Sequence, residues 1–392
     1  METKEINELG KKLELYTTVD YIGKGFPIFL PRCSKMLKTI IDYIESEEEK
    51  QGYEIVRTPS VSNSDIFKIE DRYTQEKDSL FIIEDQDDNP MVLKPYVQPF
   101  HCSIFKVNQH SYKELPIKYG ETSIVYRNEM NIKGISKTRQ ITMSDASIFA
   151  DPDKVEKEIA EILKFQSELI AKLGLDVKYE VCNWDTSKKQ DYIGTIDEWN
   201  CLTQAMKNAL KSLNLEYTET TRSRMYGPRI RIVYNGKSFS SIQVDFEITH
   251  RFDLKYKDKD NKDKFPIYIH GTLLGSYENL IGILIEKYKG DFPFWITPEQ
   301  IYIIPSSAEY EDYADEIKKV FDENNLRAKV NKSFDSLQAK IDYAKSLKIP
   351  YIVVVDKQQM NKNCIKVISI EYEKNMKIED FVKEVTKWKK KY

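Results

Sequence analysis

The first third of the chain carries a helical pattern of apolar positions followed by a strand pattern. Apolar side chains recur at the three- and four-residue spacing of one helix face, at Met36, Leu37, Ile40, Ile41 and Ile44. This spacing predicts an amphipathic helix over residues 35–51, ending near Gly52. Residues 53–59 are then typical of a strand that stops at Pro59, because proline cannot donate to a strand ladder.

Two later segments also carry sequence patterns that predict local structure, one a helix and the other a hairpin loop. Apolar positions at helical spacing follow Asp151-Pro152-Asp153 and end at Gly174. Proline in the first turn and glycine just past the last turn favour a helix between them. Residues 255–264 mix both charge signs without periodicity between two apolar runs. Such runs are usually solvated surface, so a hairpin loop is favoured over a binding tail.

The pattern changes after Trp295, where apolar runs begin to alternate with helical periods. This alternation predicts a small α/β domain with a central sheet over residues 296–392 and a larger domain over residues 1–295. The expected strands lie at 301–305, 351–355 and 365–370, and the expected helices at 312–323, 336–347 and from about 378 onward.

The segment from Leu115 to Phe149 predicts two strands joined by a polar turn. Arg127 and Glu129 are two residues apart, which puts both on one face of a strand. The planar guanidinium of an arginine suits a phosphate, and a carboxylate beside it can accept a hydrogen bond from an exocyclic amine such as that of adenine. A cross-strand ion pair on a half-buried sheet explains the same two residues equally well.

Composition narrows the class of protein. A chain of 392 residues can bury two or three cores. The 60 Lys and Arg residues against 63 Asp and Glu residues give a net charge of -3, so no global positive field indicates nucleic-acid binding. The N-terminus lacks the apolar run of a signal peptide, and no long apolar segment suggests a membrane span, so a cytoplasmic protein is expected. The five cysteines are scattered and predict neither a disulfide framework nor a paired zinc motif.

Several short motifs occur in an order that resembles a known family. They are Lys94-Pro95, Ser111-Tyr-Lys-Glu-Leu-Pro116, Arg127-Asn-Glu129, Tyr226-Gly-Pro228, Ile242-Gln-Val-Asp245, Ile269-His270, and the glycine-rich stretch from Gly271 to Leu284. With them the chain resembles threonyl-tRNA synthetase, a class II aminoacyl-tRNA synthetase, over its catalytic core and anticodon-binding domain. The resemblance implies an α+β catalytic domain, with an antiparallel sheet flanked by helices, followed by a small α/β anticodon-binding domain. The chain shows no counterpart of the family's N-terminal editing domains, so proofreading in cis is not expected.

The resemblance also implies a nucleotide site that uses ATP with magnesium. Arg127 would contact the α-phosphate and Arg139 the γ-phosphate side, so these two are the expected catalytic residues. Glu129 would bind the adenine amine, and Ile141 stands where the family usually stacks a phenylalanine on the base. Asn279 follows a glycine-rich turn, at the position of an arginine that lies against the ATP phosphates. A neutral amide cannot compensate phosphate charge, and no neighbouring arginine visibly replaces it.

For the amino acid, the resemblance implies a pocket of six residues. They are Gln98, Asp145, Ser147, Tyr226, Gln243 and His270. Asp145 would bind the substrate's ammonium group. In the family a zinc ion reads threonine through one cysteine and two histidines, but those positions are Gln98, Ser147 and His270. Glutamine and serine are poor zinc ligands, so we expect no metal at these positions. The side chain of the substrate would then be recognised by hydrogen bonds, which suits a small polar or modified amino acid. His101-Cys102 is out of register and is expected to be an ordinary core or surface pair.

The expected partners follow from the same resemblance. Residues 35–59 resemble the motif that forms the dimer interface, so a homodimer is expected. The family's anticodon-reading arginines align with Asp342 and Ile368, and a carboxylate near RNA adds repulsion. A tRNA therefore stays a candidate partner, but standard recognition of the threonine anticodon is not expected.

Two functions remain open. One is a zinc-independent ligase that activates an amino acid and passes it to tRNA or another acceptor, which the retained Arg127, Glu129 and Asp145 favour. The other is a catalytically defective paralogue with a binding, accessory or regulatory role. Asn279 and the altered zinc positions favour that second function.

Overall fold

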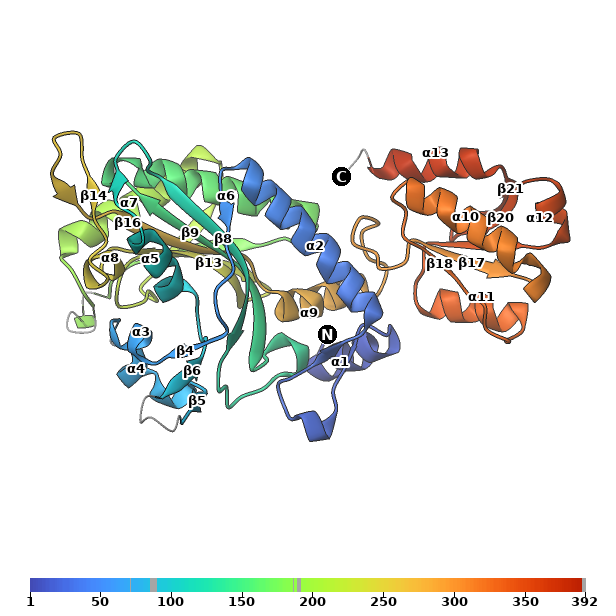
Figure 1. Cartoon of the computed structure of the whole chain (residues 1–392), viewed down its shortest axis with the longest axis horizontal. Coiled ribbons are helices and arrows are strands. Elements are labelled where there is room, and N and C mark those ends of the chain that lie inside the picture. Colours follow the sequence, from blue (N-terminus) through green and yellow to red (C-terminus); the bar gives the residue numbers. More distant parts are fainter. Residues whose placement is uncertain (71, 85–89, 186, 189–191, 390–392) are drawn as a thin grey trace. The chain divides into compact units, whose positions relative to one another are not determined.

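The computed structural model of the chain contains two compact units, each built around its own sheet (Figure 1). The first unit comprises residues 1–23, 27–40 and 282–392, and the second comprises residues 24–26 and 41–281. The structure describes the whole chain except residues 71, 85–89, 186, 189–191 and 390–392. Among the helices described, none is long and apolar enough to cross a membrane.

An eight-stranded sheet forms the centre of the second unit. It is antiparallel throughout except at its two edges, where the outermost pairs are parallel. In spatial order its strands are β11 (Tyr217–Thr220), β10 (Lys178–Cys182), β12 (Arg229–Tyr234), β13 (Lys237–Asp245), β16 (Ile267–Ser276), β9 (Gln140–Ala150), β8 (Ile117–Tyr126) and β3 (Glu54–Ile55).

Two long helices cover one face of this sheet (Figure 1). Helix α6 (Val155–Lys172) packs on β16 and β9, and α7 (Ile196–Ser212) packs on β10 and β12. Helix α6 confirms the helix expected between Asp151 and Gly174. Gly271 faces it so closely that a Cβ there would lie 2.5 Å from a methyl carbon of Ile162. Because side chains alternate along a strand, the neighbours of Gly271 face away from α6, and that opposite face holds the cavity described below.

Smaller elements surround the eight-stranded sheet. The hairpin expected over residues 255–264 is confirmed, because β14 pairs antiparallel with β15. The strands are β4 (Val61–Asn63), β5 (Ile82–Ile83), β6 (Met91–Leu93), β7 (His110–Ser111), β14 (Tyr256–Lys257) and β15 (Asp263–Lys264). The helices are α3 (Asp65–Lys68), α4 (Arg72–Gln75), α5 (Gln98–Lys106) and α8 (Ile248–Arg251).

A five-stranded sheet with helices forms the C-terminal part of the first unit. Its first three strands are parallel and its last two antiparallel. In spatial order they are β18 (Ala328–Val330), β17 (Ile301–Pro305), β19 (Tyr351–Val355), β20 (Ile365–Ile368) and β21 (Glu373–Met376). The helices are α10 (Glu311–Glu323), α11 (Leu337–Ser346), α12 (Lys357–Asn361) and α13 (Ile378–Lys389). The expected α+β sheet domain followed by a small α/β domain is therefore confirmed.

Four further elements lie at the start of the chain. They are α1 (Thr3–Lys12), β1 (Tyr16–Thr17), β2 (Ile28–Phe29) and α2 (Pro31–Lys50). The helix expected over residues 35–51 is confirmed as α2, although it begins earlier, at Pro31. The strand expected over 53–59 is mostly wrong, because only the two residues of β3 pair with β8.

The glycine-rich stretch before helix α9 (Tyr277–Tyr288) is a strand, which corrects the expected turn. Gly271 and Gly275 both lie in β16, whose register shifts between Thr272 and Ser276. Gly275 has a φ of +64°, and a Cβ there would lie 2.0 Å from the carbonyl oxygen of Phe239. Glycine is needed at this bulge because both the backbone angle and the close approach exclude a side chain.

Candidate active site

A cavity of about 360 Å³ lies on the face of the eight-stranded sheet opposite α6. Strands β9, β13 and β16 supply its floor, and the segments after β8 and before β12 supply its walls. It brings together seven of the residues proposed for the nucleotide and the amino acid, namely Gln98, Arg127, Glu129, Asp145, Tyr226, Gln243 and His270. Arg139, Ile141, Ser147 and Asn279 are not among its lining residues.

Arg127 lies just past the end of β8 and offers unused donors to the cavity. Its Nε donates to the carbonyl of Pro95 at 3.3 Å, and its terminal nitrogens make no hydrogen bond to any described residue. Burial lowers the pKa of this guanidinium, but an arginine keeps its charge at neutral pH. The two terminal nitrogens of this charged side chain can therefore donate hydrogen bonds to the oxygens of a phosphate.

Glu129 and Arg139 belong to the turn that follows Arg127. The backbone N–H of Glu129 donates to the carbonyl of Arg127 at 2.7 Å, so these residues lie beyond the strand that was expected to carry them. The Glu129 carboxylate pairs with Lys137 at 2.8 Å. Arg139 donates from Nε to the Glu129 carbonyl at 3.1 Å. The turn therefore joins the two arginines through backbone contacts.

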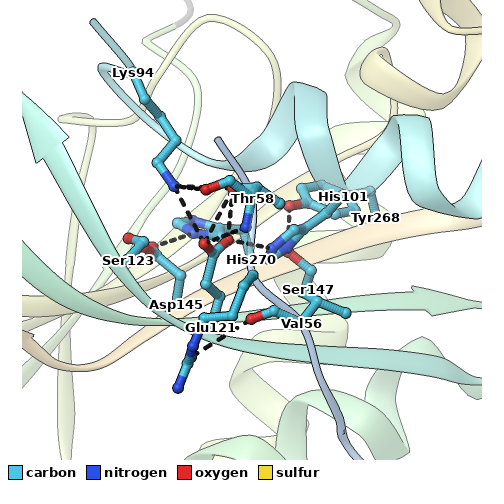
Figure 2. Close-up of polar contacts among 11 residues, drawn as sticks. Val56, Thr58, Lys94, His101, Glu121, Ser123, Asp145, Ser147, Tyr268 and His270 are labelled. Atoms are coloured by element: carbon cyan, nitrogen blue, oxygen red, sulfur yellow. Dashed lines mark hydrogen bonds and ion pairs between the residues drawn. The ribbon is translucent and has the colours of Figure 1, made fainter. Parts of the chain in front are cut away.

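Asp145, His270 and Gln98 form a chain of hydrogen bonds along the cavity floor (Figure 2 shows Asp145 and His270). The Gln98 amide nitrogen lies 3.1 Å from His270 Nδ1, and His270 Nε2 lies 2.9 Å from Asp145 Oδ1. Because an amide nitrogen can only donate, Nδ1 accepts and Nε2 carries the proton that goes to Asp145. Asp145 also accepts from the Ser123 hydroxyl. Gln98 Oε1 is buried without a partner, so it can accept a hydrogen bond from a ligand.

A second network lies beneath this chain and was not foreseen from the sequence. Glu121 accepts from Lys94 Nζ at 3.2 Å, from the Thr58 backbone N–H at 2.9 Å and from His101 Nε2 at 3.1 Å (Figure 2). Burial alone would raise the pKa of Glu121, but the hydrogen bonds from His101 and Thr58 and the charge of Lys94 lower it to about 2. Its partners come from segments far apart in the sequence, so no local spacing reveals them.

Ser147 is part of this buried network. It is fully buried, and its hydroxyl lies 2.7 Å from His101 Nδ1 and 2.6 Å from the Tyr268 hydroxyl. His101 is likewise fully buried in α5 and bonded at both ring nitrogens, which confirms it as a core residue. The hydroxyl of Ser147 is thus already engaged by protein groups.

Zinc does not fit the three positions where the family holds it. Both ring nitrogens of His270 are occupied by Gln98 and Asp145, and the Ser147 hydroxyl is held by two protein neighbours. Zinc takes thiolate, imidazole or carboxylate ligands. Over the described residues, no group of three or more His, Cys, Asp or Glu side chains is arranged to hold a metal ion.

Tyr226 and Gln243 meet at a segment that closes one wall of the cavity. Gln243 donates its amide N–H groups to the carbonyls of Gly227 at 2.7 Å and Pro228 at 3.1 Å. Gly227 lies so close to β13 that a Cβ would be 2.0 Å from the carbonyl oxygen of Val244. Gln243 therefore fixes this segment through its amide nitrogen, and its side chain is among those that line the cavity.

Two arginines that sequence reasoning missed also line the cavity, Arg224 and Arg229. The expectation that no arginine stands in for Asn279 considered only its sequence neighbours, whereas these two lie about fifty residues earlier in the chain. A signal was present, since both flank the Tyr226-Gly-Pro228 motif. Proximity to a motif could have identified them.

Asn279 lies in the first turn of α9, next to a buried acid. Its backbone N–H donates to the Ser276 hydroxyl at 3.2 Å. Both carboxylate oxygens of Glu278 accept the backbone N–H of Thr142, at 3.0 and 2.9 Å. Burial raises the pKa of Glu278 to about 7. The Asn279 side chain is a neutral amide and adds no positive charge at this end of the helix.

Comparison with known families gives two matches, which together cover about three quarters of the chain. Residues 81–288 match the family described as tRNA synthetase class II core domain (G, H, P, S and T). Residues 300–388 match the family described as anticodon binding domain.

Among individual relatives, the chain is similar to threonine–tRNA ligases of clostridia. It is 33% identical over 378 residues to that of Clostridium botulinum (strain Eklund 17B / Type B), covering 93% of the chain and 59% of the relative. It is 32% identical over 400 residues to that of Clostridium perfringens (strain SM101 / Type A), covering 97% and 62%. The chain thus spans about three fifths of the length of these relatives.

The fold is shared with a solved structure. The crystal structure described as the RNA binding domain of threonyl-tRNA synthetase from Cryptosporidium parvum Iowa II superposes with a TM-score of 0.90. The two chains are 23% identical, and the match covers 98% of each.

Proposed function

Because this chain belongs to the class II tRNA synthetase family, we propose that it is a zinc-independent ligase, of the threonyl-tRNA synthetase kind, that activates an amino acid with ATP. A carboxylate oxygen of the amino acid would bond to the α-phosphorus. The bond from that phosphorus to the bridging oxygen would break, and pyrophosphate would leave with the electron pair. The aminoacyl adenylate would then acylate a tRNA or another acceptor.

The observation that carries this proposal is the single cavity lined by both Arg127 and Asp145. Arg127 has two free donors for the α-phosphate, and Asp145 is a carboxylate that can hold an ammonium group. Placing the carboxylate of an amino acid against a phosphorus is mainly a matter of position and fixed charge. Magnesium would enter with the triphosphate, whose oxygens supply much of its coordination.

On the amino-acid side, we propose that hydrogen bonds replace the metal. The unpartnered Oε1 of Gln98 and the oxygen of Gln243 can accept from a donor on the substrate side chain. A buried acceptor left unpaired costs roughly 1–3 kcal/mol, so apolar analogues would be rejected. A small polar or modified amino acid suits this lining.

The acceptor is proposed from the second matched family. The anticodon-binding match over residues 300–388 supports a tRNA. Asp342 lies exposed on α11, and Ile368 ends β20, at positions where the resemblance implies arginines. These replacements support an acceptor other than threonine tRNA bound in the standard way.

A non-catalytic role is the second candidate, and one observation favours it. Asn279 places a neutral amide where the resemblance implies a phosphate-binding arginine. In that case the family fold would serve binding, accessory or regulatory work with no adenylate formed.

Pyrophosphate exchange separates the two candidates. The protein is incubated with ATP, magnesium, labelled pyrophosphate and, in turn, each of the twenty amino acids and a set of small modified polar amino acids, and label in ATP is counted. The ligase predicts exchange with one amino acid or a few, reduced about a hundredfold or more in Arg127→Gln, because the phosphate loses its charged donors. If the protein is folded and no amino acid of the panel supports exchange, the non-catalytic role is the one that remains.

A further inference from the structure

Three arginines line the cavity, together with four carboxylates. The arginines are Arg127, Arg224 and Arg229. Arg224 lies between β11 and β12, on the wall across the sheet from Arg127. Like charges gathered in one concave site repel each other, and an anionic ligand relieves the repulsion.

Three of the four carboxylates that line the same cavity already have hydrogen-bond or ion-pair partners. Asp145 accepts from Ser123 and His270, and Glu129 pairs with Lys137. Asp245 accepts two backbone N–H groups at 2.9 Å, at the start of α8. The fourth, Glu76, is exposed and forms no ion pair with any described residue. No carboxylate of the described chain forms an ion pair with Arg224.

Arg224 and Arg229 differ in what they already contact. Arg229 donates to the carbonyl of Arg222 at 2.7 Å and lies opposite Cys182 in the sheet, so it is tied to the scaffold. The Arg224 side chain is exposed and makes no hydrogen bond or ion pair with any described residue, whereas its backbone forms an isolated β-bridge with Gly227. Burial is the main cause that lowers the pKa of Arg127, and the charge of Arg224 acts in the same direction. Arg224 is thus near Arg127 and free to bind a ligand.

The backbone that carries Arg224 is held in place from both sides. The Ser223 hydroxyl donates to the Gly227 carbonyl at 2.7 Å, and the N–H of Ile193 donates to the Met225 carbonyl at 2.7 Å. Gln243 fixes the next carbonyls, as described above. A cation whose backbone is already fixed loses less entropy when it binds an anion.

We propose that Arg224 is a second phosphate-binding residue of the nucleotide site, acting with Arg127 on the triphosphate and supplying positive charge that Asn279 does not. This assignment rests on the proposed function, because ATP is the anion it names. Two arginines on different walls suit an extended polyanion better than a single phosphate. Arg224 should therefore matter more for ATP than for AMP.

Nucleotide binding to three variants tests the assignment. Arg224→Gln removes the charge, Arg224→Lys keeps it, and Arg222→Gln removes an equally exposed arginine two residues away that does not line the cavity. Calorimetry with Mg-ATP and with AMP gives the two Kd values for each protein. Arg224→Gln should raise the Kd for ATP about tenfold or more and the Kd for AMP by less than about threefold, since charged hydrogen bonds are the strong ones. Arg224→Lys should recover most of the ATP affinity, and Arg222→Gln should match wild type.

Other outcomes overturn the assignment in distinguishable ways. Unchanged ATP affinity in Arg224→Gln, with pyrophosphate exchange intact in the wild type, refutes the role of Arg224 and leaves the ligase standing. Equal losses for ATP and AMP, or the same losses in Arg222→Gln, mean that the segment has been disturbed rather than a phosphate contact removed. A wild-type protein that binds no ATP defeats the proposed function and the role of Arg224 together. Thermal unfolding of each variant establishes that it is folded.

Discussion

The hydrogen-bond partners of each polar side chain decide what it can still do at the cavity. His270 has both ring nitrogens engaged, by Gln98 and Asp145. The Ser147 hydroxyl is engaged by two buried neighbours. Gln98 Oε1 is buried without a partner, which makes it the atom best suited to accept a hydrogen bond from a substrate. These contacts make the three positions a hydrogen-bonding cluster.

Asn279→Arg tests whether the missing cation limits catalysis. An arginine reaches further than the asparagine and adds a charge that can bind the leaving phosphates, so the exchange rate should rise about tenfold or more. Asn279→Gln is the matched control, because it lengthens the side chain without adding charge, and it should leave the rate unchanged. An exchange rate that does not respond to arginine would indicate a site that no longer uses this position for ATP.

The sequence predicted individual site residues unevenly. Gln98, Asp145 and His270 were predicted through motifs, and they lie together although Gln98 and His270 are far apart in the chain. Arg224 was missed because no motif includes it. Lys94 was recognised only as part of a motif, and its burial against Glu121 is a tertiary contact that no local pattern encodes.

At the level of elements, long helices were predictable and short strands were not. Helices α2 and α6 each show a periodic apolar face over many residues, and such a long pattern is enough to predict a helix. Strand β3 has only two residues, and its pairing is set by β8, some sixty residues away. The bulge in β16 was mistaken for a turn because glycines mark both.

The junction of β9 and α9 should respond to pH through Glu278. Its pKa is raised from 4.5 to about 7 by burial, so the folded state holds the proton more tightly than the unfolded state. Its contribution to stability is fully present below about pH 4.5 and is lost as the pH rises through about 7. Glu278→Gln stays neutral throughout. Urea unfolding at about pH 5 and about pH 8 should show the wild type losing more stability over this interval than the variant. Equal losses in both proteins would contradict the account.

At the scale of the whole molecule, two family models match successive parts of the chain in the order that the resemblance predicts. The core match covers residues 81–288 and the anticodon-binding match covers 300–388. The motif order in the sequence was sufficient to predict this architecture. Activity was not predictable in the same way, because it depends on a few positions, such as Asn279, within a scaffold that matches throughout.

The proposed homodimer belongs to the same scale. Residues 35–59, in α2 and β3, resemble the family's dimer motif, and dimerisation would bury surface on these elements. Light scattering on the purified protein at micromolar concentration should give twice the mass of the chain. A mass equal to one chain over this range would refute the dimer.

Zinc-independent adenylation is the central claim, and exchange by metal-stripped protein tests it most directly. The protein is treated with a zinc chelator, its metal content is measured, and exchange is assayed with magnesium, ATP and each amino acid. The account predicts exchange with at least one small polar or modified amino acid in protein without zinc, and no gain when zinc is added. Exchange that appears only with stoichiometric zinc, or none with any amino acid, would contradict it.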